Sequence, residues 1–374
     1  MVDWYAPGFK AGGPIRSTVN LAEQLEDDMD VWVLTTDRDQ GDREAYPGIA
    51  ADTWTVRGKH RVFYASPSSL GWGAVLRVIR QVLPSVIYLN SMFSRPFTIY
   101  PLLMLKLGMI GCRVVLAPRG MLMVANLAQK PVRKSLYLRF IRWLGLPSRV
   151  RFHATDDTEV EDICRVMGLG VKPFLAGNMP GRQSPFIPCS EKQRGCVKMV
   201  FVGRMHPLKN LSYLLEVLRL VRDGGVELTV VASMEDLAYW DRCRAMIETL
   251  PERITVRLME DVPHEQVEQI LLSHHLFAYP TQGENFSHSI FGAFSAGRPA
   301  LISDQTPWRN LSDAKAGWDL PLTDPGSFAD KVREVRDMDL PTLNEWCLGA
   351  WTYARAYMTK SDLKKDYLSL FENV

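Results

Sequence analysis

One polar turn in the chain carries the carboxylate best suited to chemistry, that of Glu284. An apolar run at 276–279 predicts a buried strand before this turn, and the pattern at 288–296 predicts a helix after it. A second short strand, expected at 300–303, completes a strand–helix–strand unit. Such a unit brings a carboxylate and the free amides of a helix N-terminus to the carboxyl edge of a parallel sheet, where α/β proteins bind ligands.

Two cations occupy an equivalent position earlier in the second half of the chain. Arg204 follows Gly203 at the end of an apolar run, 197–202, and Lys209 stands at the start of the helix expected next. Two positive charges at the mouth of a strand, beside a helix N-terminus, bind an anion and stabilise negative charge that develops during a reaction.

The pair Gly12 and Gly13 is a further candidate for anion binding, because it precedes a helix expected at 15–25. Glycines at a helix N-terminus let backbone amides approach an anion, although taken alone this pair is more typical of a plain tight turn. A strand should precede such a loop, yet only residues 1–4 are available for it. We therefore expect the first strand either to be very short or to be cut by a late start of the chain.

Short apolar runs alternate with helical patterns, which predicts an α/β fold with parallel sheets covered on both faces. The 374 residues are enough for two domains. We place the first at 1–180 and the second at 191–355, joined by a segment rich in Pro, Gly and Ser. In the first domain, Asn90 lies just past a strand end, a position that favours binding. Arg119 follows another strand, where a guanidinium suits either a phosphate or acidic acceptor or a structural role.

The overall composition excludes a strong general attraction to nucleic acid, since 44 basic and 42 acidic residues leave a net charge of +2. No signal peptide is visible, and the longest apolar stretch, 99–110, is too short to span a bilayer. The six cysteines are scattered without metal-ligand spacing, which favours reduced thiols in a cytoplasmic protein.

Three Asp-x-Asp triplets begin at Asp28, Asp37 and Asp337, a pattern that some metal-dependent enzymes use to hold a divalent cation. A chain with 42 acidic residues contains a few such triplets by chance, and these lie in charged, turn-like surroundings. We therefore expect no metal site.

The segment 130–151 contains seven basic residues and no acidic one, interleaved with apolar side chains. The basic residues are Lys130, Arg133, Lys134, Arg139, Arg142, Arg149 and Arg151. A basic amphipathic helix with an aromatic residue suits the surface of an anionic membrane. A helix that packs on its sheet and exposes a basic face explains the pattern equally well, and both interpretations stay open.

The chain resembles retaining glycosyltransferases of family 4 in two places. Their donor-sugar loop is similar to the stretches GENFSHSI and FSAGRPALISDQTPWRNL, and their phosphate clamp is similar to FVGRMHPLKNL. The resemblance implies the GT-B type of fold, with two Rossmann-like domains facing a central cleft and a C-terminal helix in 356–374 that returns to the first domain. It implies sugar transfer (class EC 2.4) from a nucleotide sugar to a hydroxyl acceptor with retention, in polysaccharide or lipopolysaccharide synthesis. Neither a metal nor another cofactor is implied. The resemblance also implies a saccharide or lipid-linked acceptor and a location in the cytoplasm. Peripheral contact with the inner face of the membrane is one interpretation of the segment 130–151.

The same resemblance assigns roles to single residues of this chain. Glu284 would orient the donor sugar, and Arg204 and Lys209 would neutralise the diphosphate as the catalytic cations. The remaining nucleotide-sugar contacts would come from Gly12, Gly13, Gly203, Asn285, Phe286, Ser287, His288 and the position of Gly292. Asn90 and Arg119 would lie on the acceptor or phosphate side.

The chain departs from the family pattern most clearly at Gly292, where relatives carry a second glutamate that holds the ribose. Ala232, Glu260 and Ser287 also replace common family residues. These departures, with the short first strand, keep open a catalytically impaired homologue that acts as a binding or scaffold protein. A third interpretation is an epimerase of the same fold. A phosphorylase of this architecture does not fit, because it would be much longer.

Overall fold

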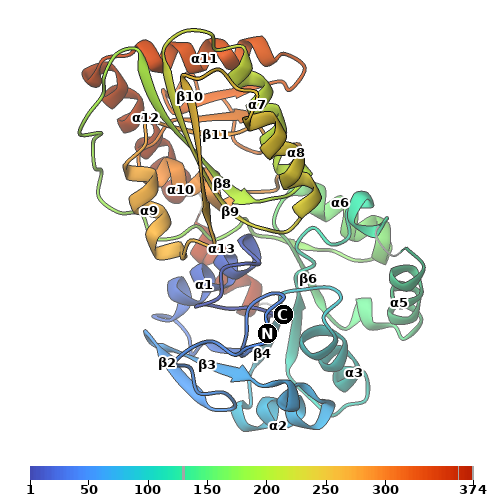
Figure 1. Cartoon of the computed structure of the whole chain (residues 1–374). Coiled ribbons are helices and arrows are strands. Elements are labelled where there is room, and N and C mark those ends of the chain that lie inside the picture. Colours follow the sequence, from blue (N-terminus) through green and yellow to red (C-terminus); the bar gives the residue numbers. More distant parts are fainter. Residues whose placement is uncertain (129–130, 361, 373–374) are drawn as a thin grey trace. The chain divides into compact units, whose positions relative to one another are not determined.

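The computed structural model describes residues 1–128, 131–360 and 362–372 and divides the chain into two compact units (Figure 1). The first unit comprises Met1–Met179 with Asp362–Val374, and the second comprises Pro180–Ser361. The segment 181–190 therefore belongs to the second unit. The C-terminal helix α13 (Leu363–Glu372) belongs to the first.

The second unit is built on one sheet of six parallel strands in the order β10-β9-β8-β11-β12-β13. The strands are β8 Cys196–Arg204, β9 Gly225–Ser233, β10 Ile254–Glu260, β11 Leu276–Tyr279, β12 Ala300–Ser303 and β13 Gly317–Leu320. The central strands β11 and β12 are buried along their whole length, as continuous apolar runs covered on both faces require. In the edge strand β10, Ile254 is buried and the residues after it are partly or fully exposed.

Helices cover both faces of this sheet (Figure 1). One face carries α7 (Leu211–Arg219), α8 (Leu237–Ile247) and α11 (Pro325–Asp337). The other carries α9 (His264–Leu272), α10 (His288–Ser295) and α12 (Leu340–Lys360). The helices change face at the point where the strand order reverses, which is the arrangement of a doubly wound α/β sheet.

The first unit contains two groups of strands, in the orders β1-β3-β2 and β4-β5-β6-β7, and all pairs are parallel except that of β2 with β3. The strands are β1 Trp32–Thr36, β2 Trp54–Arg57, β3 His60–Ala65, β4 Val86–Leu89, β5 Arg113–Leu116, β6 Arg151–Ala154 and β7 Phe174–Leu175. The α-helices are α1 Gly13–Leu25, α2 Trp72–Val82, α3 Tyr100–Lys106, α4 Val124–Leu127, α5 Pro131–Trp143, α6 Asp157–Met167 and α13. Short helical turns span Pro67–Leu70, Arg95–Ile99 and Leu146–Ser148.

The first residues of the chain join these two groups of strands. The N–H of Val2 donates to the carbonyl of Leu34 in β1 (3.1 Å), and the N–H of Asn90, just past β4, donates to the carbonyl of Met1 (3.1 Å). The segment therefore pairs on both sides, although it is too short to be assigned as a strand. Residues 1–3 thus occupy the place expected for the first strand.

Side chains alternate between the two faces of the first unit's sheet. In β3, Val62 and Tyr64 pack with α1 residues in one core, whereas Phe63 and Ala65 pack with α2 and α3 in another. Successive side chains of a β-strand point to opposite faces of the sheet, which explains this alternation. Each unit thus buries apolar residues of its own on both sides of its sheet.

Candidate active site

The candidate site lies at the carboxyl ends of β8 and β11. These strands are neighbours in the sheet although β9 and β10 come between them in the sequence. The strand order reverses at this place, and ligands of doubly wound proteins bind in the crevice that forms there. Gly203 and Arg204 end β8, and Glu284 follows β11 after a short turn.

Two loops that are far apart in the sequence are tied together above these strand ends. The N–H of Gln282 donates to the carbonyl of Leu208 (2.8 Å). The side-chain amide of Asn210 donates to the carbonyl of Pro280 (3.0 Å). The loop after β8 is therefore fixed to the loop after β11.

Lys209 and Glu284 form an ion pair at this junction. The ammonium of Lys209 contacts Oε1 of Glu284, and the two side chains are only 11% and 14% exposed. The hydroxyl of Tyr279, the last residue of β11, donates to the same oxygen at 3.2 Å. Because both side chains are shielded from water, dissolved salt weakens the attraction between them only slightly. The carboxylate of Glu284 is therefore held in one orientation by two donors.

Arg204 carries a carboxylate partner of a different kind. Its Nη1 donates to Oε2 of Glu235 at 2.8 Å, and both side chains are more than a third exposed. Glu235 follows the end of β9, which is the neighbour of β8. An exposed pair of this type contributes only about 0–1 kcal/mol, so an anionic ligand can replace Glu235 at small cost.

Gly203 is required by the packing of Tyr279. A Cβ atom at position 203 would lie 2.9 Å from Cε2 of Tyr279 and 3.0 Å from its hydroxyl oxygen. Real Cβ atoms almost never come this close to another atom, so the glycine makes room for the ring below Glu284.

The N-terminus of α10 is capped by Ser287. Its hydroxyl accepts the N–H of Ile290 at 3.5 Å, and its φ of 62° lies in the left-handed region. This angle explains why the family usually has a glycine here, since a side chain at positive φ is strained by about 1–2 kcal/mol. The cap offsets part of this strain.

The other residues of the segment 285–288 divide into one packing residue and two partly exposed ones. Phe286 is buried against Trp308, whose indole N–H donates to the Phe286 carbonyl at 2.5 Å. Asn285 and His288 remain partly exposed, and the ring of His288 lies 4.9 Å from that of Phe286. Phe286 therefore supports the loop, whereas its neighbours can reach a ligand.

Gly292 lies within α10, where nothing crowds the position. Outside the helix's own backbone, the nearest described atom to a Cβ built there would be Cδ1 of Leu271, at 3.9 Å. A Cβ atom at position 292 therefore meets no clash.

In the first unit, Gly12 and Gly13 begin α1. Gly12 has a φ of 64° and a ψ of −120°, which a residue with a side chain adopts only under strain. The amides of Phe9 and Lys10 in the same loop donate to the buried carboxylate of Asp39 at 2.6 and 3.1 Å. Asp39, a member of one Asp-x-Asp triplet, thus holds the glycine loop in place.

Asn90 and Arg119 are in direct contact in the first unit. The guanidinium of Arg119 donates to Oδ1 of Asn90 (2.6 Å), to Oδ1 of Asn178 (2.7 Å) and to the hydroxyl of Tyr88 (2.9 Å). The amide of Asn90 donates in turn to the hydroxyl of Thr18 in α1. The guanidinium is therefore bound on three sides by neutral oxygens of its own unit.

His153 extends this network below Arg119. Its Nε2 lies 2.8 Å from the carbonyl of Ala176, which can only accept, so Nε2 carries the proton. Its Nδ1 then accepts the hydroxyl proton of Tyr88 at 2.8 Å. Burial, together with the charge of Arg119, lowers the pKa of His153 to about 3. The histidine is a neutral structural residue.

Sequence reasoning missed three polar residues that the structure places in or beside the predicted sites: Tyr279, Glu235 and Glu159. Tyr279 has one signal, a hydroxyl at the end of an otherwise apolar strand just before the turn. Glu235 follows the end of β9 but matches no family motif. Glu159 is buried and accepts from the N–H groups of Gly120 and Thr155 (2.7 and 2.8 Å), which no local pattern indicates.

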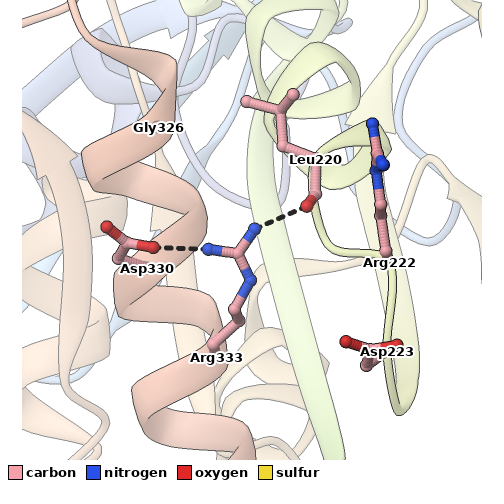
Figure 2. A pocket seen from close by; sticks show the side chains of 6 residues that line it. All are labelled: Leu220, Arg222, Asp223, Gly326, Asp330 and Arg333. Carbon is pink, nitrogen blue, oxygen red and sulfur yellow. Dashed lines mark hydrogen bonds and ion pairs between the residues drawn. The ribbon is translucent and has the colours of Figure 1, made fainter.

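A shallow hollow lies elsewhere on the second unit, at the loop that leads into β9 (Figure 2). It is lined by Leu220, Arg222, Asp223, Gly326, Asp330 and Arg333. Arg333 bridges Asp330 and the carbonyl of Leu220, so its charge is already compensated (Figure 2). None of the predicted site residues lines it.

Residues 196–337 match a family model described as Glycosyl transferases group 1. The second unit carries a group 1 glycosyltransferase domain. The matched segment contains Arg204, Lys209 and Glu284. No curated protein matches the chain.

Solved structures resemble this glycosyltransferase over 80% or more of its length. WaaG, a glycosyltransferase involved in lipopolysaccharide biosynthesis, has a TM-score of 0.64 at 14% identity over 99% of this chain and 98% of WaaG. HepE from Anabaena, solved with UDP and glucose, has a TM-score of 0.62 at 13% identity over 100% of this chain and 98% of HepE. A TarM variant from S. aureus, solved with Fondaparinux, alpha-GlcNAc-glycerol and UDP, has a TM-score of 0.55 at 16% identity over 80% of this chain, which spans 59% of TarM.

These likenesses show the fold, and the matched domain shows the class of activity. The chain is a glycosyltransferase of the GT-B fold, as its sequence motifs predicted. Among the described residues, no helix is long and apolar enough to cross a membrane, and no group of three or more His, Cys, Asp or Glu side chains could hold a metal ion. The expectation that the glycosyltransferase works without a metal stays a prediction.

Proposed function

We propose that this glycosyltransferase moves a glycosyl group from a nucleoside diphosphate sugar to a hydroxyl group, with retention of configuration at the anomeric carbon. The observation that carries the proposal is the pairing of Lys209 with Glu284 beside Arg204, at the point where the strand order reverses. A diphosphate needs cations, and sugar hydroxyls need an acceptor such as a carboxylate. The structures of HepE and TarM, which share the fold, contain UDP.

In this proposal the two cations act on the leaving group. Negative charge grows on the diphosphate as the bond to the anomeric carbon breaks, and Arg204 and Lys209 neutralise that charge. Glu284 accepts hydrogen bonds from the donor sugar, while Asn285, Ser287 and His288 supply further contacts. No protein nucleophile, metal or other cofactor is assigned. In the first unit, Gly12 and Gly13 are assigned to the diphosphate, and Asn90 with Arg119 to the acceptor or phosphate side.

The acceptor that we propose is a saccharide or a lipid-linked saccharide in the synthesis of a cell-surface polysaccharide or lipopolysaccharide. A lipid-linked acceptor is supported by a surface of α5. Four apolar side chains of this helix are exposed at spacings of four, four and three: Val132, Leu136, Phe140 and Trp143. Such spacing forms one stripe along a helix.

The opposite side of α5 packs into the core of the first unit, so α5 is a folded helix that exposes the stripe on its outer side. Leu138 and Ile141 are buried, whereas Trp143 is 80% exposed and stacks on Phe140 with ring centroids 6.2 Å apart. Three exposed basic residues of α5 border the stripe, namely Arg133, Arg139 and Arg142, and the exposed Arg149 follows the helix in the sequence. Lys130 lies outside the described residues.

The partner that fits this α5 stripe is the surface of an anionic bilayer, on the cytoplasmic side. Aromatic and aliphatic side chains insert among lipid chains while the guanidinium groups bind acidic headgroups. The packed-helix interpretation accounts for Leu138 and Ile141 but leaves the exposed Trp143 unexplained. We therefore favour peripheral membrane contact.

A panel of UDP-, GDP-, ADP- and dTDP-sugars tests the proposed function. Binding is measured by thermal shift, and transfer to added saccharide acceptors is followed by NMR, which also reports the anomeric configuration of the product. We expect one nucleotide to stabilise the protein and one matching sugar to be transferred with retention. Binding without transfer would favour the impaired homologue, and a changed donor without transfer would favour an epimerase. Absence of binding to every nucleotide would refute the proposal.

A further inference from the structure

Among the residues that the structure describes, partners contact only one of the two carboxylate oxygens of Glu284. Oε1 contacts the ammonium of Lys209 and accepts the hydroxyl of Tyr279 at 3.2 Å. No described residue donates to Oε2. A carboxylate has lone pairs for about four hydrogen bonds, two on each oxygen, so Oε2 is the atom with capacity for a ligand.

The hydroxyl of Tyr279 is held in place by packing on several sides. Its ring stacks on Phe277 with centroids 5.7 Å apart and tilts against Phe201 at 5.2 Å. Gly203 contacts its remaining edge so closely that a methyl group there would collide with the ring. The residue is only 2% exposed. A ring confined in this way presents its hydroxyl in one position, and β11 fixes that position relative to the sheet.

Lys209 and Tyr279 do different things to the same carboxylate. The lysine has four rotatable bonds, so its charge alone does not decide which way the carboxylate turns. The phenol of Tyr279 is rigid and directs its proton at Oε1 alone. Burial and the nearby charge of Glu284 raise the pKa of Tyr279 well above its ordinary value, so the phenol remains a donor.

We infer that Tyr279 is a positioning residue, which turns Glu284 so that Oε2 faces the hydroxyl groups of the donor sugar. The inference rests on the proposed function, in which Glu284 binds that sugar. It adds a residue outside the motifs and explains why β11 ends in a tyrosine although its other residues are apolar. It also gives a reason for the glycine at position 203, because a side chain there would take the space of this hydroxyl group.

The variant Tyr279→Phe removes the hydroxyl and keeps the ring. Tyr213→Phe is the matched control, because Tyr213 is also buried in the second unit and its hydroxyl has no hydrogen-bond partner. The nucleotide that stabilises the wild type most in the panel is used both as the free diphosphate and as its sugar conjugate. We expect Tyr279→Phe to lower kcat/KM for the sugar conjugate by about tenfold and to leave affinity for the free diphosphate unchanged. Tyr213→Phe should change neither quantity.

The combination with Glu284→Ala separates positioning from a merely structural role. If Tyr279 acts through Glu284, then Tyr279→Phe causes no further loss once Glu284 is alanine, so the two losses are not additive. Losses that add in full, or a Tyr279→Phe protein with unchanged transfer, would overturn the inference while the proposed function stands. If Glu284→Ala also left transfer unchanged, the assignment of Glu284 to the donor sugar would itself be wrong.

Discussion

Arg204 and Glu235 form an ion pair of 2.8 Å between the ends of two neighbouring strands, β8 and β9. Both side chains are exposed, in contrast to the buried pair of Lys209 and Glu284 in the same site. In the structure, therefore, each of the two proposed phosphate-binding cations already has a carboxylate partner. Only the exposed partner, Glu235, can be exchanged for a diphosphate at small cost.

Substitution of Arg204 should consequently affect the diphosphate and not the base. We expect Arg204→Ala to weaken binding of the nucleoside diphosphate by about ten- to a hundredfold, because charged hydrogen bonds contribute about 1.5–3 kcal/mol. Binding of the bare nucleoside should not change. Calorimetric titration of both ligands measures this difference, and equal losses for the two would contradict the clamp.

Glu235→Gln should have the opposite effect from Arg204→Ala. The neutral amide competes less well for the guanidinium, so affinity for the nucleoside diphosphate should rise by up to about fivefold, the equivalent of the upper limit for an exposed pair. The gain should shrink at high salt, which screens the original pair. Asp241→Asn, which removes the carboxylate of another exposed ion pair in the same unit, is the control. A decrease in affinity would mean that Glu235 itself contacts the ligand.

The folded state should become less stable as the pH falls, because His153 is buried in its neutral form. Its pKa is lowered from 6.5 to about 3 in the folded protein, chiefly by burial, so below 6.5 the unfolded chain binds a proton that the folded chain does not. This contribution to stability is complete above 6.5 and is lost progressively toward a pH of about 3. It amounts to about 2 kcal/mol between about pH 7 and pH 5.

Urea unfolding at several pH values measures this contribution. His153→Gln should lower stability at neutral pH, because the bonds to Tyr88 and Ala176 change, but it should flatten the dependence on pH. An equally steep dependence in the variant would show that other groups, such as His275, cause it. The pKa of His275 is lowered to about 4, mainly by burial as well.

The sequence predicted the elements around the site well, since strong apolar runs define them. β11 and β12 have the expected bounds, and α10 ends one residue earlier than expected. β2, β13, α8, α11 and α12 are among the elements that were not predicted. The strand β2 is partly exposed and carries a weak apolar pattern. In α12, large apolar side chains such as Trp346 and Trp351 flank the buried residues, so the sequence shows no clear helical period of apolar residues.

Contacts between distant residues were beyond a reading of one sequence. Glu284 and Lys209 were assigned separately to sugar and phosphate, and nothing local to either shows that they bind each other across 75 positions. Arg119 was assigned to phosphate or to structure, and its three acceptors come from separate segments. Such partners depend on strand order and loop geometry, which periodicity does not encode.

Association with vesicles should depend on the α5 stripe and its arginines. We expect sedimentation with acidic vesicles to fall with added salt, with Arg139→Glu plus Arg142→Glu, and with Trp143→Ser. Arg253→Glu plus Arg257→Glu, which changes the charge equally at exposed positions of the second unit, should have less effect. If neither the wild type nor the variants sediment at low salt, α5 is only a packed helix with a basic face.

The last prediction concerns Gly292, which stands where relatives carry the glutamate that holds the ribose. A Cβ atom at this position meets no clash, with Cδ1 of Leu271 at 3.9 Å, so a side chain can be introduced here. Two effects must be separated, because a glycine inside a helix costs about 1 kcal/mol relative to alanine. Gly292→Ala should therefore raise stability alone. Gly292→Glu should raise stability somewhat less, because glutamate is a slightly weaker helix former, and it should also increase affinity for the nucleoside diphosphate by about tenfold or more through charged hydrogen bonds to the ribose. Thermal unfolding and calorimetric titration of both variants measure the two effects. If Gly292→Glu binds the nucleotide no better than Gly292→Ala, the ribose is held by other residues and α10 does not align with the family loop as its motif indicates.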